Sequence, residues 1–199
     1  MKILLATTNP GKIEEYRYIF KDWRDSQVFT LEDFHISEKP NETGETFAEN
    51  SLQKAQFYCT RAAVPALGDD GGIEIDIFGG QPGVKTRRWL GHECTDEELI
   101  DYTLTRMSEI PWTKRGAQFR VVATLIFPDG KTFQGEGIQR GHIAEAQIRP
   151  LISGYPFRSI FIRDNTTQKP AQPTWEGEYS HRSEAVAKIK AQLIKARLL

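Results

Sequence analysis

Apolar positions near the start of the chain form first a continuous run and then a helical pattern. The run Ile3–Ala6 predicts a short buried strand. After it, Ile13, Tyr16 and Phe20 recur at helical spacing, and Asn9 stands where a helix N-cap is expected. The pattern therefore predicts a strand that leads directly into a helix.

Capping residues predict three further helices. In two of them a threonine precedes a glutamate by three positions, which is the spacing of a capping box. The boxes are Thr46 with Glu49 and Thr95 with Glu98, and Ser180 caps the last helix. The apolar positions that follow gather on one side of each helix: Leu52, Ala55 and Cys59; Leu99, Tyr102 and Met107; Val186, Ile189 and Leu193.

The segments on either side of the pair Asp69 and Asp70 predict two strands. Residues 64–68 read as a strand that ends at this pair. Residues 72–78 alternate strictly, with three isoleucines, the last of them Ile77, toward one face. On this interpretation the two carboxylates lie at the end of a strand, where ligand sites of α/β sheets tend to occur.

The second half of the chain predicts a hairpin and one more strand. Residues 117–127 form the longest strand candidate, and Pro-Asp-Gly turns them into residues 131–137. The stretch 148–177 is rich in Pro, Thr, Gln and Gly and predicts one short strand over 159–162. Strands alternating with helices indicate an α/β fold with a mixed sheet. Without a repeat or a long linker, residues 1–199 are expected to form a single domain.

Composition narrows the function classes. Apolar residues make up 39% of the chain, which indicates a globular protein, and no run approaches the roughly 20 apolar residues of a membrane span. The net charge of -1 argues against general electrostatic binding to nucleic acid. The start MKILLATTN is too short in apolar residues for a secretion signal. We therefore expect a soluble, cytoplasmic protein with no nucleic-acid or membrane partner.

The cysteines and histidines suggest no special chemistry. Cys59 and Cys94 are far apart, and no Cys or His stands at a metal-ligand spacing from them, so two ordinary reduced thiols are expected. His35, His92 and His142 have no partner pattern and are interpreted as surface or satisfied histidines.

Three clusters of polar residues are candidates for function. In TTNPGK, the donors Thr7, Thr8 and Asn9 and the charge of Lys12 surround a helix N-terminus, an arrangement that favours an anion. The alternative is an ordinary capped helix with a solvated lysine. This cluster alone does not separate the two.

The other two clusters are acidic. Glu42, Glu45 and Glu49 precede Lys54 at the next helix start, where carboxylates are also expected for reasons of capping and helix dipole. Asp69 and Asp70 precede two glycines and suit a hard cation such as Mg²⁺ or a base for water, although an Asx turn is an equal alternative. Anion donors, lysines and carboxylates together suggest a phosphate chain bridged by metal to carboxylates.

Four motifs follow one another over essentially the whole chain: LLATTNPGKIEEY, ETGETFAENSLQKA, GDDGGIEIDIFGGQPGVKTRRW and SHRSEA. In this order they resemble the inosine triphosphate pyrophosphatase family, which usually has Ser at the position of Gly71. The resemblance implies that Thr7, Asn9, Lys12 and Lys54 contact the phosphates. It implies that Glu42 and Asp70 are metal-side carboxylates and that Asp70, with its neighbour Asp69, is catalytic. It places His181 and Arg182 at the purine base.

One segment departs from the family pattern. Where the family carries Phe-Gly-Tyr-Asp-Pro, this chain, aligned on Ile160-Phe161, reads Tyr155-Pro156-Phe157-Arg158-Ser159. Matching Gly154-Tyr155 to Gly-Tyr instead would put Pro156 at the Asp position, so the Asp is lost in either alignment. Tyr155 and Phe157 keep aromatic rings for a base, but Arg158 replaces an acceptor with a donor-only side chain. The family lysine before Ser-His-Arg becomes Glu176. Base recognition is therefore expected to differ.

The resemblance implies a two-lobed α/β structure with a long mixed sheet and a cleft between the lobes. It also implies a homodimer and Mg²⁺-dependent hydrolysis of a deaminated purine nucleoside triphosphate to a monophosphate and pyrophosphate. Two alternatives remain: a pyrophosphatase for a different or modified base, and a nucleotide-binding protein without turnover.

Overall fold

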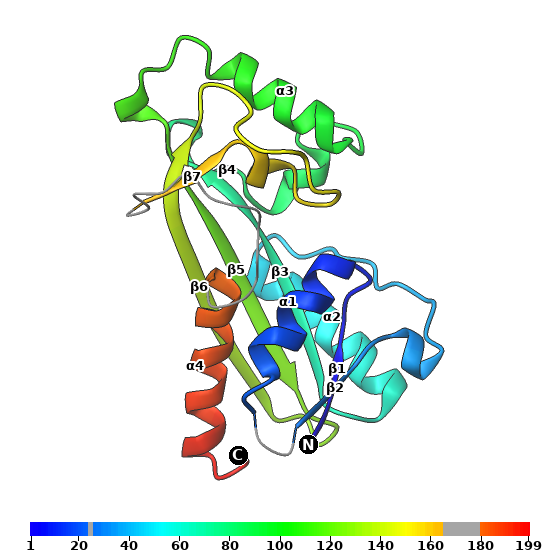
Figure 1. Ribbon diagram of the computed structural model, residues 1–199. Coiled ribbons are helices and arrows are strands. Elements are labelled where there is room, and N and C mark those ends of the chain that lie inside the picture. The colour runs from blue at the N-terminus through cyan, green and yellow to red at the C-terminus, as the bar shows by residue number, and fades with distance from the viewer. Residues whose placement is uncertain (24–25, 165–179) are drawn as a thin grey trace. The chain divides into compact units, whose positions relative to one another are not determined.

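The computed structural model describes residues 1–23, 26–164 and 180–199 (Figure 1). Its strands are β1 (Lys2–Leu5), β2 (Gln27–Phe29), β3 (Ala66–Ile75), β4 (Gln81–Pro82), β5 (Gly116–Ile126), β6 (Thr132–Ile143) and β7 (Phe161–Arg163). Its α-helices are α1 (Pro10–Phe20), α2 (Phe47–Ala62), α3 (Asp96–Arg106) and α4 (His181–Lys195). Short 3-10 segments are η1 (Glu32–Phe34), η2 (Asp76–Phe78), η3 (Gly83–Arg88), η4 (Trp112–Lys114) and η5 (Pro156–Ser159).

The strands form one mixed sheet. Their order is β2-β1-β3-β5-β6-β7, with β4 paired to β3. β1 runs parallel to β2 and β3, whereas β4 and β7 run antiparallel to β3 and β6. Leu4 of β1 is in register with Phe29 on one side and Ala66 on the other. The α/β class with a mixed sheet is therefore confirmed.

The chain divides into two compact units, and each is described by itself. Unit 1 holds residues 1–71, 121–137 and, in the described part, 180–199. Unit 2 holds residues 72–120 and 138–164 of the described chain. The boundaries fall inside β3, β5 and β6, so the chain passes from one unit to the other within strands. None of the helices that the structure describes is both long and apolar enough for a membrane span.

In unit 1, alternate residues of β1 enter two different cores. Ile3 and Leu5 pack with residues of α1 and α4, whereas Leu4, and Ala6 directly after the strand, pack with residues of α2. This is the alternation expected of a strand with helices on both faces. α1 and α4 therefore share one face of the sheet and α2 covers the other.

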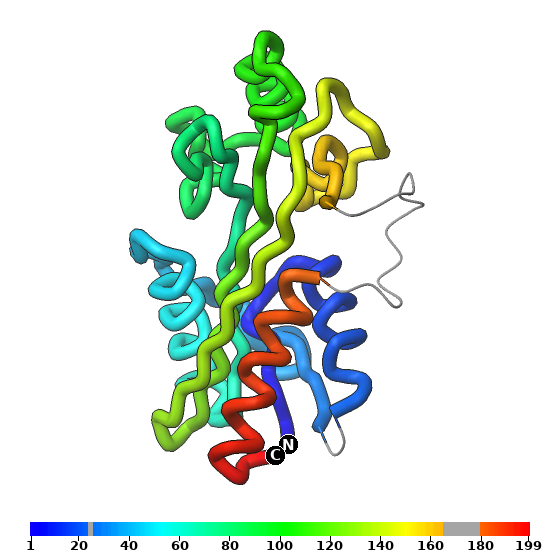
Figure 2. The backbone as a smooth tube through the Cα atoms, turned by 90° about the vertical axis from the view of Figure 1, so that its left-hand side faces the viewer, coloured from blue at the N-terminus to red at the C-terminus, as the bar shows by residue number. Residues whose placement is uncertain are grey.

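Glycines let two of these helices approach the sheet closely. α4 runs alongside β6 (Figure 2), and Gly135 and Gly137 of β6 lie against the carbonyls of Ala185 and His181. A Cβ at either glycine would collide with helix backbone. Gly68 of β3 gives α2 the same access, since its position faces the backbone of Ser51 and Ala55. The absence of side chains here fixes where both helices lie.

The predicted helix starts are confirmed. The Asn9 side chain accepts from the amides of Gly11 and Lys12. The two threonine–glutamate capping boxes form, and Ser180 forms a third with Ser183. The predicted hairpin is also confirmed: β5 turns at Pro128–Gly130 into β6, which is longer than expected. The strand predicted over 159–162 corresponds to β7.

Three local predictions are wrong. β3 does not end at Asp69 and Asp70 but continues through them to Ile75, because the glycines that follow stay in the ladder. Ile77 lies in η2 and is exposed, since the alternation stops where the 3-10 turn begins. Leu52 is also exposed rather than part of the buried stripe of α2.

Unit 2 has its own core around β3, β5 and α3. Ile73, Ile75, Leu99 and Met107 are fully buried in it. Beside them lies Arg115, which is 1% exposed and donates to backbone carbonyls of four residues: Met107, Ile110, Ile143 and Ala144. Burial lowers the pKa of Arg115. The carbonyls satisfy this cation and join α3 to the end of β6.

Candidate active site

The loop between β1 and α1 is held by its own side chains. The Thr7 hydroxyl accepts from the amide of Asn9 at 3.2 Å, and Asn9 Oδ1 accepts from the amides of Gly11 and Lys12 at 3.0 and 3.3 Å. These bonds follow from the strand-to-helix turn, whose first amides have no helical acceptor. They place Lys12 in the first turn of α1.

Asp69 and Asp70 point to opposite faces of the sheet. Successive side chains of a strand alternate, and both residues lie within β3. Asp69 accordingly contacts Lys12 of α1 and Arg182 of α4, which share one face. Asp70 contacts Asn50 and Lys54 of α2 on the other face. Two adjacent carboxylates thus serve two separate clusters.

Asp69 is the centre of a buried ion cluster. Lys12 Nζ lies 3.0 Å from Asp69 Oδ1, and Arg182 Nε lies 3.1 Å from Asp69 Oδ2. A second nitrogen of Arg182 donates to Glu15 Oε2 at 3.0 Å. Asp69 and Glu15 are each 2% exposed and Arg182 is 5% exposed. Charges as buried as these are retained only when they are paired.

The charges of this cluster shift one another's pKa values. Burial alone would raise the pKa of Asp69. The positive charges of Lys12 and Arg182 lower it by more than burial raises it, so the pKa of Asp69 falls well below the usual range. Burial lowers the pKa of Lys12, and repulsion by Arg182 and Lys54 adds to this effect. Together they outweigh the attraction of Asp69, which raises the pKa. Burial and the charge of Asp69 raise the pKa of Tyr16 well above its ordinary value. Asp69 is therefore a carboxylate that holds two cations.

The second cluster gathers around Lys54. Its ammonium lies 3.1 Å from Glu42 Oε2 and 3.9 Å from Asp70 Oδ1, and it donates to the backbone carbonyl of Asp69 at 3.0 Å. Burial lowers the pKa of Lys54, but Asp70, Asp69 and Glu42 raise it more. Glu42 and Asp70 thus face one cation from two sides, and their oxygens form a hard donor set.

Asp70 differs from Asp69 in its electrostatics. Burial raises the pKa of Asp70 above its ordinary value, although Lys54 and Lys12 act against it. Asn50 Nδ2 donates to Asp70 Oδ2 at 3.1 Å, and Asn50 Oδ1 accepts from the amide of Gly44 at 2.8 Å. The Asn50 amide therefore ties Asp70 to the loop that carries Glu42.

Glu15 and Asn50 are members of these clusters that the sequence analysis missed. Glu15 follows Lys12 by three positions and Asn50 precedes Lys54 by four, so each shares a helix face with its lysine. A polar residue at that spacing from a candidate lysine was the available signal. Both side chains are buried, which a sequence pattern does not reveal.

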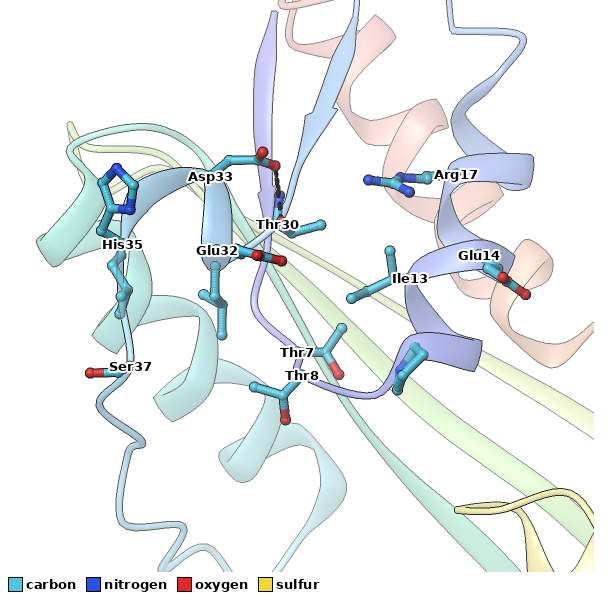
Figure 3. Close-up of a pocket in the computed structure, with 13 residues that line it drawn as sticks. Thr7, Thr8, Ile13, Glu14, Arg17, Thr30, Glu32, Asp33, His35 and Ser37 are labelled. Atoms are coloured by element: carbon cyan, nitrogen blue, oxygen red, sulfur yellow. Dashed lines mark hydrogen bonds between the residues drawn. The ribbon is translucent and has the colours of Figure 1, made fainter.

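A pocket of about 770 Å³ lies beside the Thr7–Thr8 loop (Figure 3). Its charged lining consists of three carboxylates and one arginine, with His35 alongside: Glu14, Glu32, Asp33 and Arg17. The amide and hydroxyl of Thr30 donate to Asp33 and lower its pKa. This acidic lining disfavours a polyphosphate. The lysine-bearing clusters around Asp69 and Asp70 are the better anion site.

The residues expected at the base lie in different places. His181 is buried at the first position of α4 in unit 1. Tyr155, Phe157 and Arg158 belong to unit 2, where Phe157 is 3% exposed and part of the core. The Arg158 guanidinium lies 4.3 Å from the centre of the Tyr155 ring. Glu176 lies outside the described residues. The base-binding roles stay predictions.

Comparisons with known proteins give one consistent result. Residues 3–192 match the model of the Ham1 family. A relative from Thermus thermophilus, named dITP/XTP pyrophosphatase, is 36% identical over 94% of this chain and 88% of its own. A relative of the same name from Thermoanaerobacter is 32% identical over 98% of both chains. The solved structure of the Staphylococcus aureus Ham1 protein has a TM-score of 0.78 and 28% identity, covering 98% of this chain and 100% of its own. The chain belongs to the Ham1 family.

Proposed function

We propose that this chain hydrolyses the triphosphates of deaminated purine nucleosides to a monophosphate and pyrophosphate. One observation carries the proposal: two lysines that the sequence marks out contact three such carboxylates in unit 1. Lys12, in the first turn of α1, contacts Asp69, and Lys54 contacts Glu42 and Asp70. The names of the relatives, dITP/XTP pyrophosphatase, supply the substrate class.

The phosphate chain would bind at the first turn of α1. The positive end of the α1 dipole and the charge of Lys12 attract an anion there. Lys54 adds a second cation from α2. A triphosphate carries about four negative charges, so positive groups on several sides are needed before an anionic nucleophile can approach.

Glu42 and Asp70 fit a divalent cation. Their carboxylates already face one positive charge, the Lys54 ammonium, and they offer the oxygen donors that Mg²⁺ prefers. Bound Mg²⁺ would neutralise phosphate charge and make a water more acidic. These two residues are the ones that would hold it.

Asp70 would act as the base for the attacking water. Its carboxylate lies beside the Lys54 ammonium and accepts a hydrogen bond from Asn50, so it is held in place to take a proton from a water. The water oxygen would form a bond to the α-phosphorus, the bond from that phosphorus to pyrophosphate would break, and Asp70 would take the proton. Asp69 would not touch the water. It would act as a positioning residue, because it holds Lys12 and Arg182.

A second candidate, a pyrophosphatase for a different base, is favoured by Arg158. This residue stands where the resembling family has Asp, and its guanidinium accepts no hydrogen bond from a base N–H. A protein that binds nucleotides without turnover is the third possibility from the sequence. It is disfavoured by the retained Lys12, Lys54, Glu42 and Asp70.

A substrate panel separates these candidates. The purified chain is incubated with MgCl₂ and dITP, XTP, ITP, GTP, ATP or dUTP, and pyrophosphate is measured. The proposal expects dITP, XTP and ITP to be the fastest substrates and expects no turnover when MgCl₂ is replaced by EDTA. Preference for another base would favour the second candidate, and binding of nucleotide without pyrophosphate release the third.

The remaining expectations from the resemblance belong to the same proposal. We expect a homodimer and a cytoplasmic location. Light scattering at micromolar concentration tests the first, and a monomer there would overturn it.

A further inference from the structure

A set of metal-binding side chains lies in unit 2, among residues that the proposed function does not use. Within the described ranges, His92, Cys94 and Glu98 are the one set of three His, Cys, Asp or Glu side chains whose ligand atoms all lie within 4.8 Å of one another. The interpretation of Cys94 as an ordinary thiol without a metal-ligand neighbour is incomplete. His92 stands two positions before Cys94, and the first turn of α3 places the Glu98 carboxylate close to both side chains.

The local fold holds these side chains together. Gly91 turns the chain at φ +90° directly before His92. The amide of Cys94 donates to the carbonyl of Arg87 at 2.8 Å, which anchors the loop. Thr95 then caps α3, and the capping box places Glu98 at the third helical position. The arrangement therefore follows from a turn, an anchored loop and a helix cap.

One of the three distances between ligand atoms already suits a tetrahedral metal ion, and the other two are at most 4.8 Å. His92 Nε2 and Glu98 Oε1 are 3.4 Å apart. Ligand bonds to zinc of about 2.0–2.3 Å require ligand atoms roughly 3.3–3.6 Å apart. The Cys94 thiol is buried, whereas the His92 and Glu98 side chains are 55% and 44% exposed. Small movements of these two exposed side chains toward Sγ would close the set.

The two oxygens of Glu98 are divided between different tasks. Oε2 accepts from the amide of Thr95 at 2.7 Å and so completes the capping box. Oε1 is the oxygen that faces His92. A metal on Oε1 therefore need not break the cap of α3.

The donor set selects the type of metal. One nitrogen, one sulfur and one oxygen are a borderline-soft set that suits Zn²⁺, whereas Mg²⁺ takes oxygen ligands. The positive end of the α3 dipole lies at this helix start, and the first-turn carboxylates of Asp96 and Glu97 offset it. Arg87 neutralises only one of them, because it pairs with Asp96 at 2.5 Å.

We propose that His92, Cys94 and Glu98 bind one zinc ion, with the fourth position open to water or an external ligand. Binding joins the loop at residues 91–95 to α3 and releases the proton of the Cys94 thiol to solvent. The site is separate in residues and in metal preference from the proposed Mg²⁺ site. Failure of the zinc proposal would leave the proposed hydrolysis untouched.

Cobalt provides a site-specific test, because a cysteine ligand gives Co²⁺ a thiolate charge-transfer absorption that oxygen ligands do not give. The full chain is freed of metal, kept reduced, and titrated with CoCl₂ in excess MgCl₂. The band should appear and saturate at one equivalent. Cys94→Ser should abolish it, while Cys59→Ser, the matched thiol control, should keep it. No band in the wild type, or a band that survives Cys94→Ser, would overturn the proposal.

Zinc affinity is then measured by competition with a chromophoric chelator. His92→Ala changes an exposed side chain and should weaken binding at least about tenfold, since even outer-shell changes cost that much. Glu98→Gln keeps a residue type that also forms capping boxes and should weaken binding similarly. Circular dichroism of each variant checks that it is folded. Folded variants that bind zinc as tightly as the wild type would contradict the assignment of these ligands.

Discussion

At the scale of single residues, the two adjacent aspartates are the feature that explains most. Because β3 is extended through them, Asp69 faces α1 and α4 and Asp70 faces α2. Their environments differ accordingly: cations lower the pKa of Asp69, whereas burial raises that of Asp70. A carboxylate whose pKa is lowered in the folded state adds to the free energy of unfolding when it is charged. A carboxylate whose pKa is raised there subtracts from it.

The first prediction is a contrast in stability between these neighbours. Asp69→Asn should lower the free energy of unfolding by about 3 kcal/mol, because it leaves buried Lys12 and Arg182 short of a countercharge. Asp70→Asn, measured without metal, should not lower it, because a buried charge is removed. Urea denaturation at neutral pH gives both values. Equal losses in the two variants would contradict the separate roles.

The second prediction concerns the lysines. If Lys12 and Lys54 face phosphates, alanine at either should reduce kcat/KM by about tenfold or more, and by a similar factor for every triphosphate, whatever its base. Lys195→Ala, an exposed lysine at the end of α4, is the control and should change little. A defect confined to some bases would instead put that lysine near the base.

At the scale of elements, the close approach of α4 to β6 positions Arg182. Gly137 lies against the carbonyl of His181, one residue before Arg182. The contact with β6 therefore determines how close to the sheet the start of α4, which carries Arg182, can lie. Arg182 in turn reaches Asp69 on β3 and Glu15 on α1. Packing between a strand and a helix thus determines the geometry of the buried ion cluster.

The third prediction tests this packing. Gly137→Ala should lower the free energy of unfolding by about 1–3 kcal/mol, because the new methyl group meets helix backbone that cannot rotate away. It should also reduce activity, since α4 must move with Arg182. Thr132→Ala, an exposed position at the start of β6, is the control and should cost less than about 1 kcal/mol. A Gly137→Ala protein as stable and active as the control would refute the argument.

Elements also show what the sequence predicts well and where it fails. Capping residues such as Asn9 and Thr46 give the helix starts, because their side chains bond the first amides locally. β3 is missed as one strand because charged and glycine positions interrupt its apolar pattern, and only long-range partners such as Lys12 and Lys54 explain those charges. Long-range packing also explains why Glu15 and Asn50 were not predicted as members of the site, because their burial depends on contacts between elements.

At the scale of the whole molecule, the comparisons and the resemblance agree on the family, and base selectivity is where this chain is expected to differ. Arg158 can donate to O6 and N7 of a 6-keto purine, as arginine does to guanine in DNA, but has no acceptor for N1–H. Its guanidinium now lies over the Tyr155 ring.

The fourth prediction is that the wild type discriminates against ATP less than a protein with Asp at this position. Arg158→Asp should raise the preference for ITP and XTP over ATP by roughly 5- to 150-fold, because Asp accepts from N1–H and adenine has no N1–H. GTP carries the same N1–H as ITP, so this substitution should not increase discrimination against GTP. The measurement is kcat/KM for ITP, XTP, GTP, ATP and dUTP in both proteins. If the wild type already rejects GTP and ATP strongly and the substitution leaves that ranking unchanged, Arg158 does not set specificity.

The central claim is that the Lys54–Asp70 cluster supports release of pyrophosphate from a nucleoside triphosphate. The most direct measurement is product analysis by ion-exchange chromatography after incubation with dITP and MgCl₂, for the wild type and Asp70→Asn. We expect dIMP and pyrophosphate in equal amounts from the wild type, and turnover lower by at least ~10²-fold in the folded variant. Formation of dIDP and orthophosphate, or an Asp70→Asn protein that releases pyrophosphate at the wild-type rate, would contradict it.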